Sequence, residues 1–323
     1  MTTSRAAVPA PTVDDLEALR GPLTGYCYRM LGSAADTDDA VQDTVIRAYS
    51  ALDRYDPDRT ALSTWVHRIA TNICLDHLRV ARRRGTSMEL GPARTEPGDI
   101  GEPLPADRFV EPMPDSRLIT ATDPAEIVAQ RATVRLAFVT ALQVLAPRQR
   151  AVLVLRDVLA FSAEETADVL DTSVAAVNSA LQRARARLDA ARSVTTDPLL
   201  PDDAEQRQLL NSYVAAFEAH DIPALRKLLR DDATTSMPPF AWWLDGADVI
   251  AAVMATGDAC IDDRLLPVAI NGAPGFGQYR LEDGVHHPFA LLLIETSGDK
   301  VAELTTFLGT ADRFPEFGLP TKL

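Results

Sequence analysis

The chain has 323 residues, of which 46% are hydrophobic and 24% are charged, as in a globular protein of two or three domains with buried cores. No apolar stretch approaches the ~20 residues that cross a bilayer, and the first twelve residues contain no apolar segment of signal-peptide length. We therefore expect neither a membrane-spanning nor a secreted protein. The formal net charge is −14, which taken alone argues against a protein that binds nucleic acids.

The three cysteines indicate the redox environment. Cys27, Cys74 and Cys260 are far apart and odd in number, so they fit neither a disulfide framework nor a CxxC metal site. A reducing cytoplasm is the expected location, and the sequence predicts no metal and no cofactor.

The negative charge is unevenly distributed along the chain. Residues 201–323 hold nine basic and 19 acidic residues. By contrast, residues 59–84 contain six arginines and one acidic residue, and residues 173–192 contain four arginines and one acidic residue. Because exposed charges are screened beyond about 10 Å, a local positive face attracts phosphates more than the total charge repels them. Either segment taken alone is equally consistent with a solvated helix face.

Three amphipathic helices are predicted over residues 14–84, after a disordered N-terminus at residues 1–13. Asp14 and Glu17 have capping-box spacing, and the first helix should run to about Leu31. The second begins near Asp36, and the third runs from about Ala61 to Arg84. Apolar residues recur at helical spacing in both, which predicts a compact helical domain. The stripes are formed by Val41, Val45, Ile46 and Tyr49 in the second helix and by Trp65, Ile69 and Ile73 in the third.

The next segment differs in composition. Residues 85–123 are rich in proline and glycine, hold eight acidic and three basic residues, and show no sustained period. This composition predicts a flexible, anionic linker. Helical patterns resume at Asp123-Pro124 and define a second domain over residues 124–193, and another linker follows at 194–203.

The last part of the chain, residues 204–323, has a mixed pattern. It opens with two helices and continues with turn-rich sequence, in which Asn271-Gly272 is predicted to shape a tight loop. Helices followed by an antiparallel meander predict an α+β domain. The candidate strands are Gly277–Leu281, Pro288–Thr296 and Val301–Leu308.

Residues 162–187 have the pattern of a helix-turn-helix. Ser162 and Glu165 have capping-box spacing for a short helix, and Thr172 or Ser173 caps the next helix. The second helix of such a motif can lie in the major groove, where Asn, Gln and Arg pair with base edges. An ordinary helical hairpin with a solvated arginine face is the alternative. The candidate contacts to duplex DNA are Ser173, Ala175, Asn178, Ser179, Gln182 and Arg183, with Arg185 and Arg187 as phosphate contacts.

The third helix of the N-terminal domain suggests a different chemistry. Its arginines are interleaved with aromatic and amide groups, which suits unpaired bases because rings stack and amides bond to base edges. The indole of Trp65 is expected to pack in the core, and the loop from Tyr55 to Ser63 is better placed to receive an extruded base. This interpretation requires Arg82–Arg84 to face solvent. His67 is not expected to bind a metal, because no second ligand lies at zinc spacing. The candidate contacts are Arg59, Thr60, Ser63, Trp65, His67, Arg68, Asn72, Asp76 and Arg79.

These segments resemble a known family. LAPRQRAVLVLRDVLAFSAEETADVLDTSVAAVNSALQRARARL resembles region 4 of bacterial sigma factors of the extracytoplasmic-function (ECF) group. DTDDAVQDTVIRAY resembles the region 2 helix that grips RNA polymerase, and STWVHRIATNICLDHLRVARRR resembles the helix that melts and reads the minus-ten promoter element. The matches have the right order and the right intervening gap, and they cover roughly residues 14–190.

The resemblance implies a promoter-specificity subunit without catalysis of its own. Region 2, at residues 14–84, would bind the clamp helices of core RNA polymerase. Region 4, at residues 124–193, would bind the minus-thirty-five element and the polymerase flap, while the linker would thread the RNA exit path. The candidate polymerase contacts are Asp39, Gln42, Asp43 and Arg47.

Residues 204–323 resemble a SnoaL-like domain, of the nuclear-transport-factor-2-like and ketosteroid-isomerase-like cone fold. The similar segments are LLNSYVAAFEAHDIPALRKLLRDDATTSMPP, WWLDGADVIAAVM and the closing strands. The resemblance implies a multidomain protein with two all-α helical domains and a C-terminal α+β cone-shaped domain. Sigma factors with such a tail form a subgroup that is regulated by the tail, without a separate anti-sigma protein.

The cone fold encloses an apolar pocket. Acid–base catalysis, binding of an unknown small molecule, docking within the chain and plain core packing are the alternatives for its aromatic residues. Residues 204–323, which we call the tail, are acidic, and each of the two sigma regions contains a basic segment. We therefore expect the tail to pack against one or both sigma regions and to tune promoter opening. The pocket candidates are Tyr213, Phe217, Phe240, Trp242, Trp243, His286 and Phe307.

Three classes of function fit the sequence. The leading class is a sigma factor that binds core RNA polymerase and promoter DNA. The second is a DNA-binding head fused to a small-molecule-binding or isomerase-like enzymatic tail. The third is a one-component transcription factor that binds duplex promoter DNA without core polymerase.

Overall fold

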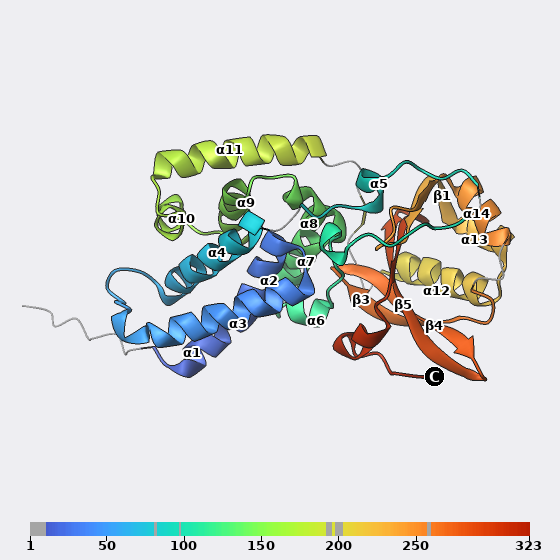
Figure 1. The fold of residues 1–323 in the computed structure, drawn as a ribbon, viewed down its shortest axis with the longest axis horizontal. Helices are drawn as coiled ribbons and strands as arrows, with labels where there is room; N and C mark the ends of the chain where they lie inside the picture. The colour runs from blue at the N-terminus through green and yellow to red at the C-terminus, as the bar shows by residue number, and fades with distance from the viewer. Residues whose placement is uncertain (1–10, 81–82, 97, 192–195, 198–202, 257–259) are drawn as a thin grey trace, which may run out of the picture. The chain divides into compact units, whose positions relative to one another are not determined.

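The computed structural model describes residues 11–80, 83–96, 98–191, 196–197, 203–256 and 260–323. The chain divides into two compact units, Met1–Ala81 with Leu142–Ala191, and Arg82–Ala141 with Arg192–Leu323. We call them the helical unit and the sheet unit, because the described strands all lie in the second (Figure 1). Residues 1–10 of the predicted N-terminal disorder lie outside the described residues, as do most residues of the predicted 194–203 linker.

Local capping sets the first helices of the helical unit. Thr12 and Asp15 form a capping box, in which the backbone N–H of each residue donates to the side chain of the other, at 2.7 Å and 3.3 Å. The predicted box at Asp14 and Glu17 is wrong, because the Glu17 carboxylate instead accepts from Arg20 at 2.8 Å. The elements are α1 (Val13–Ala18), α2 (Arg20–Leu31), α3 (Ala34–Ser50), the 3₁₀ turn η1 (Leu52–Arg54) and α4 (Leu62–Val80).

The second half of the helical unit packs on the first. Its elements are α9 (Pro147–Leu153), the π-helical turn η3 (Val154–Val158), α10 (Ala163–Leu170) and α11 (Val174–Ala191). Arg150 of α9 is buried, and its guanidinium donates to the carbonyl of Met30 at the end of α2. On the α4 side, Thr64 donates to Glu165 of α10 at 3.4 Å. Residues 11–80 and 142–191 therefore belong to one compact unit.

The sheet unit combines short helices with one six-stranded sheet. Its helical elements are α5 (Ser87–Leu90), η2 (Ala106–Arg108), α6 (Asp115–Leu118), α7 (Pro124–Val134), α8 (Leu136–Gln143), α12 (Ala204–Glu218), α13 (Ile222–Leu228), α14 (Ala247–Ala255) and η4 (Ala311–Phe317), of which α8 ends two residues inside the helical unit. The strands are β1 (Leu229–Ser236), β2 (Trp243–Asp245), β3 (Arg264–Ile270), β4 (Ala273–Glu282), β5 (Val285–Ser297) and β6 (Lys300–Leu308). The three predicted strands are confirmed, since each lies within β4, β5 or β6.

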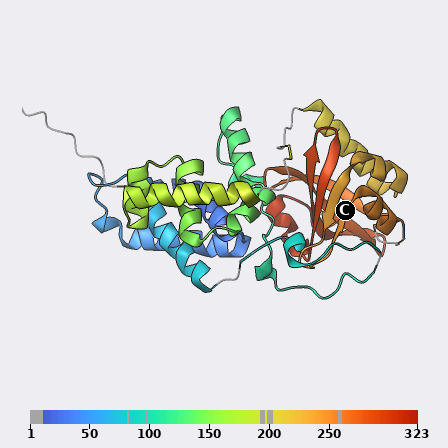
Figure 2. The ribbon, with the colours of Figure 1, turned by 90° about the horizontal axis from the view of Figure 1, so that it is seen from above.

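The sheet has the order β2-β1-β6-β5-β4-β3. Strands β3 to β6 form the predicted antiparallel meander, while β1 joins β6 in parallel. Two tight hairpin tips, Asn271-Gly272 and Asp283-Gly284, have positive φ at both residues, as two-residue hairpins require. Figure 2 shows α12 and its neighbouring helices beside the sheet. A hydrophobic core of the unit lies between these helices and one sheet face.

The segment predicted as a flexible linker has defined contacts in the sheet unit. We call residues 83–119 the strap; Figure 1 draws it as a long teal trace between α5 and α6. The backbone of Arg94 pairs with β2, where its N–H donates to the Trp243 carbonyl at 2.8 Å. The Leu104 N–H donates to the Pro239 carbonyl, also at 2.8 Å. Backbone hydrogen bonds to the tail therefore replace the solvent contacts expected of a free linker.

The predicted third helix does not reach Arg84: α4 is described over Leu62–Val80, and Arg83 and Arg84 are not helical. Arg84 belongs to the strap, where only 6% of it is exposed and its guanidinium donates to the Phe109 carbonyl at 3.0 Å. Arg83 is exposed and pairs with Glu89 at 2.6 Å, whereas Arg82 lies outside the described residues. The requirement that Arg82–Arg84 face solvent is therefore not met at Arg84.

Candidate nucleic-acid interface

The helix-turn-helix is built by two local caps. Ser162 and Glu165 form the predicted capping box, with hydrogen bonds of 2.8 Å and 3.1 Å between backbone N–H groups and side-chain oxygens. Asp171 ends α10 in the left-handed conformation at φ 49°. The hydroxyl of Ser173 then accepts from the Ala176 N–H at 3.2 Å, which starts α11. Three residues therefore separate α10 from α11.

The helix α11 is strongly two-sided. Val177, Leu181, Ala184 and Leu188 are buried at spacings of three and four residues. The opposite side of the helix faces solvent with small, amide and basic side chains, which is the arrangement that a major-groove helix requires. All eight predicted duplex contacts are exposed: Ser173, Ala175, Asn178, Ser179, Gln182, Arg183, Arg185 and Arg187.

One of these arginines is already engaged. The Arg185 guanidinium donates to both carboxylate oxygens of Asp157, at 2.8 Å and 2.6 Å, and this pairing raises the pKa of Arg185. Arg183 and Arg187 have no ion-pair partner among the described residues. Of these three arginines, Arg185 is therefore the one whose side chain also fastens α11 to η3.

The helix α4 exposes a second, different face. Arg68, Asn72, Asp76 and Arg79 are exposed along one side, and Arg79 pairs with Asp76 at 2.6 Å. Trp65 continues this side of α4 but is half-buried, with its ring 5.2 Å from that of Tyr55.

The loop before α4 is fixed by the same tyrosine, whose hydroxyl donates to the Thr60 carbonyl at 2.9 Å. Arg59 is exposed, while Thr60 and Ser63 are half-buried. The loop and the exposed side of α4 thus bring together most of the predicted contacts to unpaired bases.

His67 is the exception, and its prediction as a contact to unpaired bases is wrong. Only 3% of His67 is exposed, because α4 turns it toward the core of the helical unit. Its ring meets Tyr26 and Phe161 edge-on, with ring centres 5.4 Å and 5.1 Å away. Its Nδ1 lies 2.7 Å from the Ser63 carbonyl oxygen, and burial lowers its pKa. His67 lies close to the arginines in the sequence, but its side chain lies on a different side of the helix.

The predicted pocket residues of the tail separate into different places. Tyr213, Phe217 and Trp242 share the core between the helices and the sheet, with Phe240 at its margin. Phe307 is buried on the opposite sheet face, since it lies three positions after Leu304, which faces that core. The Trp243 indole donates to the Gly91 carbonyl of the strap at 2.9 Å. His286 lies 2.8 Å from the Asp262 carbonyl oxygen, so these seven residues do not line one pocket.

Two family descriptions match the chain. Sigma-70 region 2 matches residues 16–84, and Sigma-70, region 4 matches residues 135–188. ECF RNA polymerase sigma factor SigG from Mycobacterium tuberculosis (strain CDC 1551 / Oshkosh) is 43% identical over 312 residues, which are 95% of this chain and 83% of SigG. The chain belongs to the ECF family of RNA polymerase sigma factors.

Two further comparisons agree with this assignment. The ECF sigma factor SigJ from Mycobacterium tuberculosis (strain ATCC 25618 / H37Rv) is 32% identical over 226 residues, which are 69% of this chain and 63% of SigJ. The crystal structure of Mycobacterium tuberculosis SigJ has a TM-score of 0.59 at 23% identity and covers 96% of this chain and 100% of that chain. That likeness shows a shared fold. The predicted fold class of this ECF sigma factor is confirmed at the level of two helical sigma regions followed by an α+β tail.

The helix α3 carries the residues expected to contact polymerase. Asp39, Gln42, Asp43 and Arg47 are all exposed on one side of this region 2 helix. Ile46 and Tyr49, which the sequence placed in the buried stripe, are 54% and 60% exposed on the same side. The stripe that packs inward is shifted around the helix and consists of Thr37, Ala40, Val41, Thr44 and Ala48.

One structural residue of the sigma factor was missed. Besides the Met30 carbonyl, the buried Arg150 guanidinium contacts Gln143, whose side-chain oxygen lies at 2.5 Å and whose carbonyl lies at 3.2 Å. It thereby ties region 2 to region 4 inside the helical unit. Within the segment PRQR, Arg150 resembles one more basic residue of a surface, and nothing in the local sequence indicates that it is buried.

Proposed function

We propose that this sigma factor brings α11 and α4 to the two elements of a promoter while α3 holds core RNA polymerase. The observation that supports this most directly is the pair of exposed basic faces on α11 and α4, which differ in composition. Small and amide groups dominate on α11, whereas α4 combines arginines with a neighbouring aromatic loop. Duplex DNA favours the first chemistry, and unpaired bases favour the second.

In this assignment α11 of region 4 reads the duplex element. Asn178, Gln182 and Arg183 are exposed side chains that can form two hydrogen bonds with a base edge. The side chains of Ala175 and Ser179 are small, so the helix can approach the bases closely. Arg187 neutralises a phosphate.

We assign the strand-separated promoter element to region 2. Arg68 and Arg79 follow the backbone of the parted strand, and Asn72 bonds to a base edge. The Tyr55–Trp65 ring contact lies at one end of this side of α4, where an extruded base would stack. His67 instead supports α4 from behind.

The polymerase surface of α3 combines charge with two apolar side chains. Asp39, Gln42, Asp43 and Arg47 surround Ile46 and Tyr49 on the exposed side of the helix. Exposed apolar residues within a polar rim are typical of the centre of a protein interface. We assign this side of α3 to the clamp helices, and region 4 to the flap.

The tail acts by binding rather than by catalysis in this proposal. Sigma factors are not enzymes, and the tail aromatics Tyr213, Phe217 and Trp242 are packed core residues. The tail regulates initiation through contacts within the chain, and the protein works beside RNA polymerase in the cytoplasm. No helix in the part of the chain that the structure describes is long and apolar enough to span a membrane.

The deciding experiment is transcription from a promoter selected with this protein. Core RNA polymerase plus the full-length chain should start transcripts at one defined position, and core polymerase alone should not. Specific duplex binding without any effect on core polymerase would instead support a one-component transcription factor and contradict the proposal.

A further inference from the structure

The tip of the β3–β4 hairpin, Asn271-Gly272, is buried rather than exposed. None of Asn271 is accessible to solvent, although both tip residues have the positive φ of an exposed hairpin turn, 53° and 69°. A loop tip that is fully covered is unusual, because turns normally satisfy their polar groups with water. The groups that cover it come from the strap and from α7.

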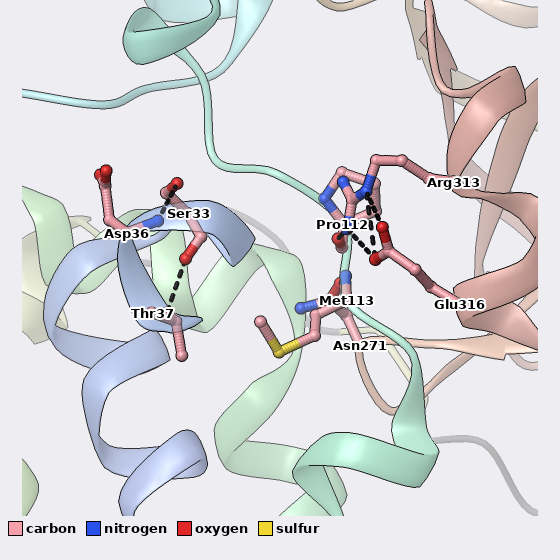
Figure 3. A network of polar contacts seen from close by, with 8 residues as sticks. All are labelled: Ser33, Asp36, Thr37, Pro112, Met113, Asn271, Arg313 and Glu316. Atoms are coloured by element: carbon pink, nitrogen blue, oxygen red, sulfur yellow. Dashed lines mark hydrogen bonds and ion pairs between the residues drawn. The ribbon is translucent and has the colours of Figure 1, made fainter. Parts of the chain in front are cut away.

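The strap side of this contact is a closed pair of hydrogen bonds. The Met113 N–H donates to Asn271 Oδ1 at 2.9 Å, and the Asn271 N–H donates to the Met113 carbonyl at 3.0 Å (Figure 3). The next tip residue, Gly272, donates its N–H to Asp115 Oδ1 at 2.6 Å. Beside them, Arg313 donates to the Pro112 carbonyl at 3.0 Å, as Figure 3 also shows. Both polar groups of the Met113 backbone are therefore satisfied by one asparagine of the tail.

The same tip also holds the end of α7, just before the match to region 4 begins. Asn271 Nδ2 donates to the Val134 carbonyl at 2.9 Å. A methyl group on Gly272 would lie 2.6 Å from the Arg131 carbonyl oxygen, so only glycine allows this approach. Arg135, the residue after Val134, forms a buried ion pair with Glu295 of β5. Two tail residues thus fasten both the C-terminal end of the strap and the entry to region 4.

The strap is fastened at its other end as well. Ser87 donates its hydroxyl to the Phe240 carbonyl at 2.8 Å, and the Trp243 indole donates to Gly91. In this state Arg84, the last arginine of the region 2 segment, is buried in the sheet unit. A free segment of the strap's length can extend to roughly 120 Å, whereas a segment held at both ends cannot.

We propose that Asn271-Gly272 is a latch that holds the strap and α7 on the tail and keeps the sigma factor in a state of low activity. The inference rests on the proposed function, because regions 2 and 4 must reach separate promoter elements. That separation requires the connecting segment to leave the tail. Opening the latch frees Met113, Asp115 and Val134, lets the strap extend and exposes Arg84.

Hydrogen–deuterium exchange of the full-length protein tests the contact. Asn271→Ala removes the side-chain hydrogen bonds to Met113 and Val134, and it should speed the exchange of the Arg94, Leu104 and Met113 amides by about 10- to 100-fold. Asp115→Ala loosens the contact from the strap side without altering any strand and should act in the same direction. The double variant should add little to the stronger single variant, because both remove one contact.

The hairpin tip Asp283-Gly284 supplies the matched control. Its residues have φ values of 51° and 80°, and the space around Gly284 is open. Asp283→Ala and Gly284→Ala therefore place the same strain on a hairpin that holds no strap, and they should leave strap exchange unchanged. Strap exchange that stays at the wild-type rate in both Asn271→Ala and Asp115→Ala would overturn the latch.

Transcription with core RNA polymerase tests whether the latch keeps the sigma factor in a state of low activity. Asn271→Ala and Asp115→Ala should raise the yield of specific transcripts several-fold over wild type, and the control variants should not. Faster strap exchange without a change in transcription would show a structural contact only, and it would overturn the regulatory role. If wild type and every variant fail to initiate, the proposed sigma function fails, while the exchange data still decide whether the latch exists.

Discussion

Arg183 and Arg185 lie two positions apart on α11, yet their guanidinium groups have different surroundings. Two helical positions turn a side chain by about 200°, so the two arginines leave the helix on different sides. Arg185 meets Asp157 of η3, and Arg183 extends from the exposed side that also carries Gln182. Arg185 therefore stabilises the motif, whereas Arg183 is the arginine that we propose reads a base.

Arg183→Ala should weaken promoter binding by about 1–3 kcal/mol at a single base pair, because a bidentate contact to one base would be lost. Binding measured on a set of duplexes, each changed at one position of the minus-thirty-five element, reports this loss. Preference at one position should disappear while the others remain.

Arg185→Ala is the matched control for this measurement. It removes a helix-fastening ion pair, so it should affect all duplexes equally. Equal weakening across sequences by Arg183→Ala would make Arg183 a phosphate contact instead.

The burial of His67 predicts a pH dependence of the helical unit. Because burial lowers its pKa below the ordinary 6.5, the unfolded chain takes up a proton at a higher pH than the folded chain does. Its contribution to the free energy of unfolding is complete above about pH 6.5 and is lost as the pH falls from there toward the lowered pKa. Denaturant unfolding between about pH 5 and pH 7 should show this decline.

His67→Phe keeps an aromatic ring between Tyr26 and Phe161 and removes the titrating group. This variant should lose part of the pH dependence below 6.5. An unchanged slope would show that His67 does not cause it.

At the scale of one element, α3 shows how an apolar side chain can belong to a surface. Its inward stripe is made of small and β-branched residues, which leaves Ile46 and Tyr49 on the exposed side among the acidic residues. Burying such side chains against a partner stabilises a complex far more than burying its polar rim. The apolar content of α3 is therefore divided between the core and a docking surface.

Ile46→Ala and Tyr49→Ala should each weaken binding to core RNA polymerase by about 1–2 kcal/mol, with no loss of thermal stability. Titration of labelled protein with core polymerase measures the first quantity, and a melting curve measures the second. Val13→Ala on α1, also at an exposed apolar position, is the control. Wild-type affinity in both α3 variants would remove this side of the helix from the interface.

At the scale of the whole molecule, the tail holds segments that are far apart in the sequence. Hydrogen bonds join Met113 to Asn271, Gly91 to Trp243 and Ser87 to Phe240, each across more than 150 residues. The strap is also anionic, so the attraction between an acidic tail and basic helices does not explain these contacts. Hydrogen bonds between uncharged side chains and the backbone, made by Asn271, Trp243 and Ser87, explain them instead.

The candidate interface could be predicted where its determinants are local. The Ser162–Glu165 capping box, the Asp171 turn and the repeat of Val177, Leu181, Ala184 and Leu188 all act within one or two helical turns. They fix α10 and α11 and therefore the exposed side of α11. The inward turn of His67 and the outward turn of Ile46 could not be predicted, because a stripe of mixed residues fits a helix in more than one orientation.

The sequence by itself determined the order of the elements, the helix-turn-helix, the closing strands and the kinship with ECF sigma factors, because each depends on neighbours along the chain. Only the tertiary structure decided that Arg150 is a core residue, that Arg84 is covered and that the strap is docked. The reason is physical: burial and pairing at these sites are set by groups that lie far away in sequence. No periodicity or composition within the segment itself contains that information.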